Sequence, residues 1–190
     1  KPQPVNNGEG VKISFETEFK GALTSTVTPP ALAPLLKACG FTESIDSGVS
    51  ATYAPNSTID GDSVTLWFNK DGIQHKVSGC RGTFKLSLKT NEIAVASFEF
   101  TGLFVNSSTF AADGAIQTPT FNSETPNIFK SANMLINSYA AIIENLTFDL
   151  GNTITKRPSA NASSGVAAYS ITQREISGSM RSEEHTSELQ

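Results

Sequence analysis

Few residues in this chain could supply catalytic chemistry, and His75 is the first of them. It is the sole histidine outside the last ten residues, and it alternates with Ile73 and Val77 on the apolar side of a segment. A Ser-His-Asp or Cys-His site would have to be built around it, and no G-x-S-x-G or other nucleophile signature is present. We therefore expect a packed or edge histidine here and no catalytic triad.

The two cysteines, Cys39 and Cys80, lie far apart in the sequence. With one histidine they match none of the usual zinc-ligand spacings. Asp60 and Asp62 flank a glycine and could offer calcium two carboxylates, but the rest of an EF-hand loop is missing, so a turn is expected. We predict no metal and no cofactor. Two buried free thiols are favoured over a disulfide, because no signal-peptide layout precedes them.

Glu16 and Glu18 are expected to project from the same face of their strand, and paired carboxylates are what glycosidases use. Lys12 and Lys20 share that face, which favours a solvated strand surface over a catalytic pair. The segment 79–82 places Gly79 and Gly82 around Cys80 and Arg81. It opens a strand and no helix, so it lacks a phosphate-binding helix N-terminus and is expected to form a bulge or tight bend.

Four N-x-[ST] sequons occur, at Asn56, Asn106, Asn145 and Asn161. In a chain so rich in Ser, Thr and Asn they arise by chance, so they do not argue for secretion.

Composition excludes several classes of protein. The chain has 190 residues, 17% of them charged, and a formal net charge of −4. No apolar run approaches the ~20 residues of a transmembrane helix, and the charge lacks the basic excess that binds nucleic acid. The last ten residues, Arg181–Gln190, correspond to the in-frame translation of a common sequencing adapter and are interpreted as an artefact. We expect a single β domain over residues 1–180, truncated at both ends.

Alternation of apolar and polar side chains dominates the chain and predicts a mainly β protein. Strands are expected at 11–20, 64–68, 73–77, 84–88, 94–100, 142–150 and 166–176, with weaker candidates at 48–53 and 133–137 and turns at 69–72, at Asn91 and at 151–152.

One short helix is expected at 33–39, where Leu32, Leu35, Leu36 and Cys39 recur with helical spacing. Pro34 suits the first turn and Gly40 suits a left-handed C-terminal cap, so the helix is bounded at both ends.

The segment between Phe104 and Pro126 is rich in Ser, Thr, Asn and Ala, and it exceeds the ~12–15 residues beyond which structureless loops become uncommon. It is expected to be a functional loop or a mobile arm. Phe110, Ile116 and Phe121 stand isolated in these polar surroundings and are candidate subunit-contact residues, the alternative being a surface loop with incidental apolar residues.

Four segments carry a resemblance to a known family: 34–41, 79–83, 98–103 and 146–152. Each is built from core and turn residues, and together they resemble the tail tube (major tail) proteins of long-tailed bacteriophages and prophages. The resemblance covers most of residues 11 to 180. It implies a β-sandwich or barrel-like subunit with one flanking helix, without enzymatic activity or cofactor.

The resemblance also implies a function and its partners. Copies of the chain would close into hexameric rings that stack into a tube, with other tail proteins as partners and with DNA passing through the lumen without specific binding. The location would be the virion tail, after synthesis in the bacterial cytoplasm, with no membrane involved. The alternative that the residues leave open is a non-catalytic β-sandwich binding module of carbohydrate-binding or adhesin type; an unrecognised enzyme is less favoured.

Overall fold

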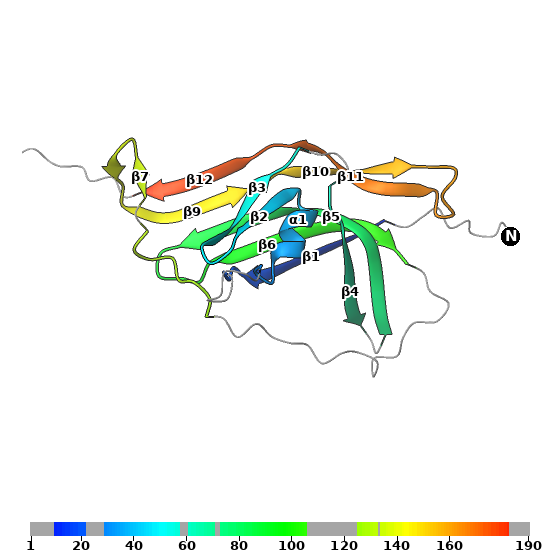
Figure 1. The fold of residues 1–190 in the computed structure, drawn as a ribbon, viewed down its shortest axis with the longest axis horizontal. Coiled ribbons are helices and arrows are strands. Elements are labelled where there is room, and N and C mark those ends of the chain that lie inside the picture. The colour runs from blue at the N-terminus through cyan, green and yellow to red at the C-terminus, as the bar shows by residue number, and fades with distance from the viewer. Residues whose placement is uncertain are drawn as a thin grey trace, which may run out of the picture.

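The structure is a computed structural model that describes residues 10–21, 29–57, 61–70, 73–105, 125–132 and 134–182. It is mainly β with one short helix, as the alternation predicts (Figure 1). The elements are β1 (Gly10–Glu18), α1 (Ala33–Ala38), β2 (Phe41–Asp46), β3 (Ser50–Pro55), β4 (Val64–Lys70), β5 (Ile73–Lys89), β6 (Val95–Phe104), β7 (Leu135–Ile136), β8 (Tyr139–Ala140), β9 (Ile143–Asp149), β10 (Asn152–Pro158), β11 (Val166–Arg174) and β12 (Ser177–Ser182).

The main sheet is antiparallel, with strand order β1-β6-β5-β9-β12, and β4 pairs with the first half of β5. The predicted hairpin at 64–77 is confirmed, although part of its turn lies outside the described residues. The prediction of a separate strand at 84–88 is wrong, because β5 runs for 17 residues from Ile73 to Lys89. The register of β5 against β6 shifts between Ser78 and Arg81, and Gly79 has φ +61°. The expected bulge is therefore present, and it lies within one continuous strand instead of separating two strands.

The C-terminal strands form a long two-stranded ribbon in two parts. β9 pairs with β12 and β10 pairs with β11, so the same two chain segments stay together across a break at Gly151 and Glu175. There the Glu175 amide donates to the Gly151 carbonyl over 3.1 Å, and Gly151 has φ +60°, consistent with the predicted turn. The segment 166–176 is thus not the last strand, since β11 ends at Arg174 and β12 follows.

The core lies between the main sheet and α1. Register places Phe15, Phe98 and Phe84 side by side across three strands, and the Phe84 and Phe98 ring centroids are 5.3 Å apart. Leu36 of α1 and Leu150 close this aromatic layer, and both are buried. The helix ends before Gly40, whose φ of +85° is the expected left-handed cap.

The opposite face of the main sheet is polar. One row of cross-strand neighbours runs over five strands and consists of Glu16, Ser97, Lys85, Asp149 and Ser177. We call this row and the polar residues beside it, Lys12, Ser14, Glu18, Glu99, Ser87, Thr147 and Ser179, the polar sheet face.

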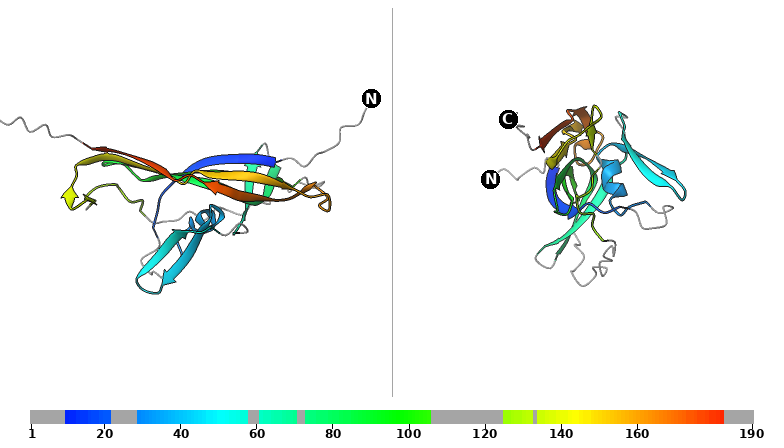
Figure 2. Two further views of the ribbon diagram at one scale, coloured as in Figure 1. Left: turned by 90° about the horizontal axis from the view of Figure 1, so that it is seen from above. Right: turned by 90° about the vertical axis from the view of Figure 1, so that its left-hand side faces the viewer.

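The β2–β3 hairpin projects away from the sheet and the helix, as Figure 2 shows in its left-hand view. Its burial pattern becomes fully exposed toward the turn, so the hairpin end contributes little to the core. The sequence does not predict β2, because Thr42, Glu43 and Ser44 interrupt the apolar pattern.

Candidate functional site

The side chain of Asn152 joins three segments that lie far apart in the sequence. Its amide nitrogen Nδ2 donates to the Cys39 carbonyl over 2.7 Å and to the Gly82 carbonyl over 2.9 Å. Its backbone N–H donates to Thr83 Oγ1 over 3.1 Å. The end of α1, the middle of β5 and the start of β10 are therefore held at one point.

Arg174 extends this junction to the β2–β3 hairpin. Its Nε donates to Asn152 Oδ1 over 3.0 Å, and its Nη2 donates to the carbonyls of Gly40 and Asn56, each over 3.1 Å. Carbonyls at a helix C-terminus lack intrahelical donors, and a cation there is favourable. We call Asn152 and Arg174, with the carbonyls that they bind, the Asn152 junction.

Three of the four segments that carry the family resemblance meet at the Asn152 junction. Gly82 has to be glycine there, because a Cβ atom would lie 2.4 Å from the Glu99 carbonyl oxygen. The resemblance therefore rests on backbone crossings and close packing, not on reactive groups.

Arg81 forms a second buried polar contact in the molecule. Its Nη1 donates to the Tyr169 carbonyl over 2.5 Å and to Ser170 Oγ over 3.4 Å, and its Nη2 donates to the Gly61 carbonyl over 2.5 Å. These bonds attach β11 to the bulge of β5. The sequence predicts only a bulge or tight bend at Arg81, and no signal in its immediate neighbourhood indicates the contact with β11.

The cysteines are buried and free, which confirms the expectation for them. Burial raises the pKa of the Cys39 thiol to about 12, against a smaller opposing effect of the Arg174 charge. Burial likewise raises the pKa of Cys80 to about 11. Because the thiolate is the nucleophile and metal ligand, neither side chain is poised for covalent chemistry.

His75 is packed among aromatic rings, as predicted. Its ring stacks on Phe68 at 4.9 Å between centroids and lies 5.9 Å from the Phe104 ring. Its neighbours are therefore aromatic, which suits a core contact better than a general base.

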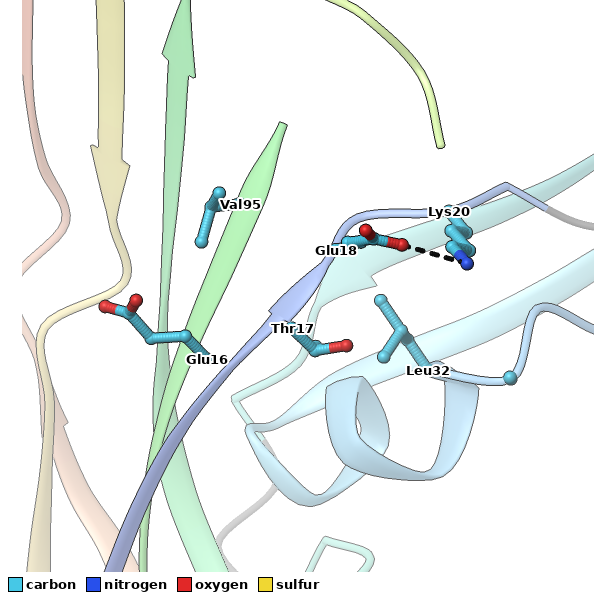
Figure 3. A pocket seen from close by; sticks show the side chains of 7 residues that line it. Glu16, Thr17, Glu18, Lys20, Leu32 and Val95 are labelled. Carbon is cyan, nitrogen blue, oxygen red and sulfur yellow. Dashed lines mark ion pairs between the residues drawn. The ribbon is translucent and has the colours of Figure 1, made fainter. Parts of the chain in front are cut away.

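Glu16 and Glu18 line an open cavity of about 510 Å³ beside Leu32 and Val95. Their side chains are turned away from each other, as Figure 3 shows. Glu18 forms an ion pair with Lys20 at 2.9 Å, and Glu16 accepts a hydrogen bond from Ser97 over 3.1 Å. Two carboxylates that diverge toward separate partners form an ordinary solvated strand surface, in agreement with the expectation.

Within the described ranges, no group of three or more His, Cys, Asp or Glu side chains could hold a metal ion. The helix that the structure describes is too short to cross a membrane. The candidate contact residues Phe110, Ile116 and Phe121 lie outside the described residues, so their role stays a prediction.

The free strand edges are the remaining feature that could serve a function. β1 pairs only with β6, and β12 pairs only with β9, among the strands that the structure describes. Met180 of β12 is 38% exposed, although it lies opposite the apolar Leu146. Unpaired strand edges are templates for pairing with another chain.

A family model described as phage tail tube protein matches residues 3–183, which is nearly the whole chain. No curated protein matches the chain.

Proposed function

The chain belongs to the phage tail tube protein family, and on that premise we propose that its copies close into hexameric rings that stack into the conduit for DNA ejection. Family membership makes it a structural protein of the phage tail that assembles with itself and with other tail proteins. The observation that carries the finer proposal is a main sheet whose end strands, β1 and β12, each have an unpaired edge among the described strands. A polar row runs unbroken between these two strands.

Ring closure is proposed to occur through the two edge strands. β1 and β12 lie at opposite ends of the same sheet order, so a head-to-tail contact can continue the sheet from one copy into the next. Such an interface closes into a ring when its rotation divides the circle, and otherwise produces an open filament.

The polar sheet face is proposed to line the lumen. A protein gains affinity for DNA by neutralising phosphates with Lys and Arg, so a conduit needs cations that are already neutralised. Lys12 forms an ion pair with Glu99 at 2.8 Å, and Lys85 lies directly opposite Asp149 in the register. DNA would then slide past this face without being held.

No catalytic role is proposed, because the buried thiols, the packed histidine and the diverging carboxylates offer no reactive constellation among the residues that the structure describes. Synthesis in the cytoplasm of the bacterial host, followed by incorporation into the virion without a membrane, completes the proposal.

The segment between Phe104 and Pro126 is proposed as an arm that contacts a neighbouring subunit or ring, through Phe110, Ile116 and Phe121. Its length and its isolated apolar residues support this role. Deletion of residues 108–122 should abolish tube assembly, and unchanged assembly would refute the arm.

Electron microscopy of the negatively stained protein tests the assembly itself. Rings or stacked tubes with a central hole are expected, and a stable dispersed monomer would refute the proposal. The substitution Met180→Glu places a charge on the β12 edge and should prevent ring closure while the monomer stays folded. Ile73→Glu is the matched control, because Ile73 is also 38% exposed but lies at the far end of the β4–β5 hairpin.

A further inference from the structure

Arg81 is a buried cation that has no carboxylate partner among the residues that the structure describes. It is 9% exposed, and its three hydrogen bonds go to two carbonyls and one hydroxyl. No ion pair involves it in the part of the chain that the structure describes. Its Nε is buried and has no hydrogen-bond partner.

Such an arrangement is costly for the isolated subunit. A buried charge is normally paired, and a buried N–H without an acceptor carries a desolvation penalty. Arg174, the other partly buried arginine described above, uses its Nε for a hydrogen bond. Arg81 therefore retains donor capacity and positive charge that an anion could satisfy.

A cavity lies beside Arg81 with a volume of about 240 Å³. Its lining includes the polar residues Ser63 and Ser78 and the apolar residues Leu103 and Val166. A carboxylate can accept two parallel hydrogen bonds from a guanidinium, and these charge-assisted bonds are stronger than neutral ones. The cavity is large enough for a carboxylate side chain, since one water occupies about 30 Å³ of liquid volume.

Asp46 has the complementary properties. It ends β2 in the projecting β2–β3 hairpin, and its carboxylate is exposed. That carboxylate makes no ion pair or hydrogen bond with the described residues. Ile45 and Val49 beside it are 40% and 67% exposed, so the hairpin end is an apolar projection that carries one unpaired negative charge.

We propose that the Arg81 cavity receives the Asp46 carboxylate from a second copy of this chain. The inference rests on the proposed function in one respect, namely that copies assemble. Charge complementarity supports it, because neither the buried Arg81 nor the exposed Asp46 has a charged partner among the described residues, and apolar residues lie beside both. The contact would make the projecting hairpin a connection between subunits.

The chemistry of the cavity can be tested on the unassembled chain. Thermal unfolding is measured in 200 mM sodium acetate and in sodium chloride of equal ionic strength, with acetate as the probe for a carboxylate. Acetate binding to the folded state should raise the midpoint by about 2–4 °C for a chain of this size. Equal midpoints in the two salts would overturn the inference.

The identity of the occupant is tested by assembly. Asp46→Asn should raise the protein concentration needed for rings at least tenfold, because it removes one partner of a buried charge pair. Asp46→Glu keeps the carboxylate and should assemble closer to the original chain. Glu92→Gln, at an exposed ion pair with Lys89, is the control and should have no effect.

The two measurements separate the failure of this inference from that of the proposed function. This inference alone would be overturned if the Asp46→Asn variant formed rings as readily as the original chain. It would also be overturned if the original chain formed rings but acetate did not raise its thermal midpoint. If neither the variants nor the original chain formed rings, the proposed function would be refuted, and so would the assignment of Asp46 as the occupant of the cavity. Asp46 is exposed and makes no described side-chain contact, so loss of folding cannot explain an effect of Asp46→Asn.

Discussion

Replacing Asn152 by alanine should destabilise the protein by about 3 kcal/mol. The change removes two neutral hydrogen bonds that Asn152 Nδ2 donates to the Cys39 and Gly82 carbonyls. It also removes the bond that Asn152 Oδ1 accepts from the charged Arg174. A neutral bond contributes about 1 kcal/mol and a bond to a charged group about 1.5–3 kcal/mol, so the sum is about 3.5–5 kcal/mol. Asn152 is half-buried, and water that replaces some of these bonds lowers the expected loss.

Urea unfolding followed by circular dichroism measures this loss, and the thermal midpoint should fall by about 6–12 °C. The exposed Asn69→Ala on β4 is the matched control and should change stability by less than about 0.5 kcal/mol. An Asn152→Ala variant within about 1 kcal/mol of the original chain would refute the view that the Asn152 junction holds the fold together.

A double-mutant cycle between Asn152→Ala and Arg174→Met tests whether the two side chains stabilise the protein together or independently. Because Arg174 Nε donates to Asn152 Oδ1, each substitution already weakens the other residue's bonds. The coupling should be at least about 1 kcal/mol, and strictly additive losses would show that the two side chains act independently.

Two further predictions concern the core. Gly82→Ala should cost about 2–4 kcal/mol in urea unfolding, because its Cβ would lie 2.4 Å from the Glu99 carbonyl oxygen, whereas Gly21→Ala meets nothing within 4 Å and should be near neutral. The thiols of Cys39 and Cys80 should resist iodoacetamide at pH 8 until the protein unfolds, and rapid labelling of the native state would contradict their burial. Because folding raises both thiol pKa values above the ordinary value of 9, stability should be unaffected by these groups below pH 9 and should fall as the pH rises toward 11.

The elements that the sequence predicts best are those with strong periodicity. The alternation in β1 and the apolar spacing of α1 give their elements to within one or two residues, because each buries one face against the aromatic layer. Asn91 and Gly151 mark turns correctly, since both adopt positive φ. These elements can be predicted because neighbouring residues in the sequence determine their conformation.

β2 and β10 could not be predicted in this way. Thr153, Thr155 and Lys156 leave β10 without a continuous apolar face, and β10 is a strand because β11 pairs with it. The continuity of β5 could not be predicted either, because Gly79 and Gly82 suggest an end of the strand, whereas β5 continues through a bulge at Gly79. Strand pairing overrides local propensity at these places.

The contacts of the Asn152 junction could not be predicted from the sequence either. Gly151 and Asn152 predict a turn, but the carbonyls that the Asn152 amide contacts depend on how β5, β10 and the end of α1 cross. The prediction that no reactive site exists depended on simpler facts, namely the scarcity of histidine and the wide separation of the two cysteines in the sequence.

The pairing of β1 with β6 sets the order in which the chain can fold during synthesis. Gly10 lies opposite Leu103, so β1 has no strand partner until about 90 further residues have been made. At about 5–20 residues per second that interval lasts about 5–20 s, during which Val11, Ile13 and Phe15 have no sheet to cover them. The apolar stripe that later forms part of the core therefore needs protection from aggregation in the nascent chain until β6 has been made.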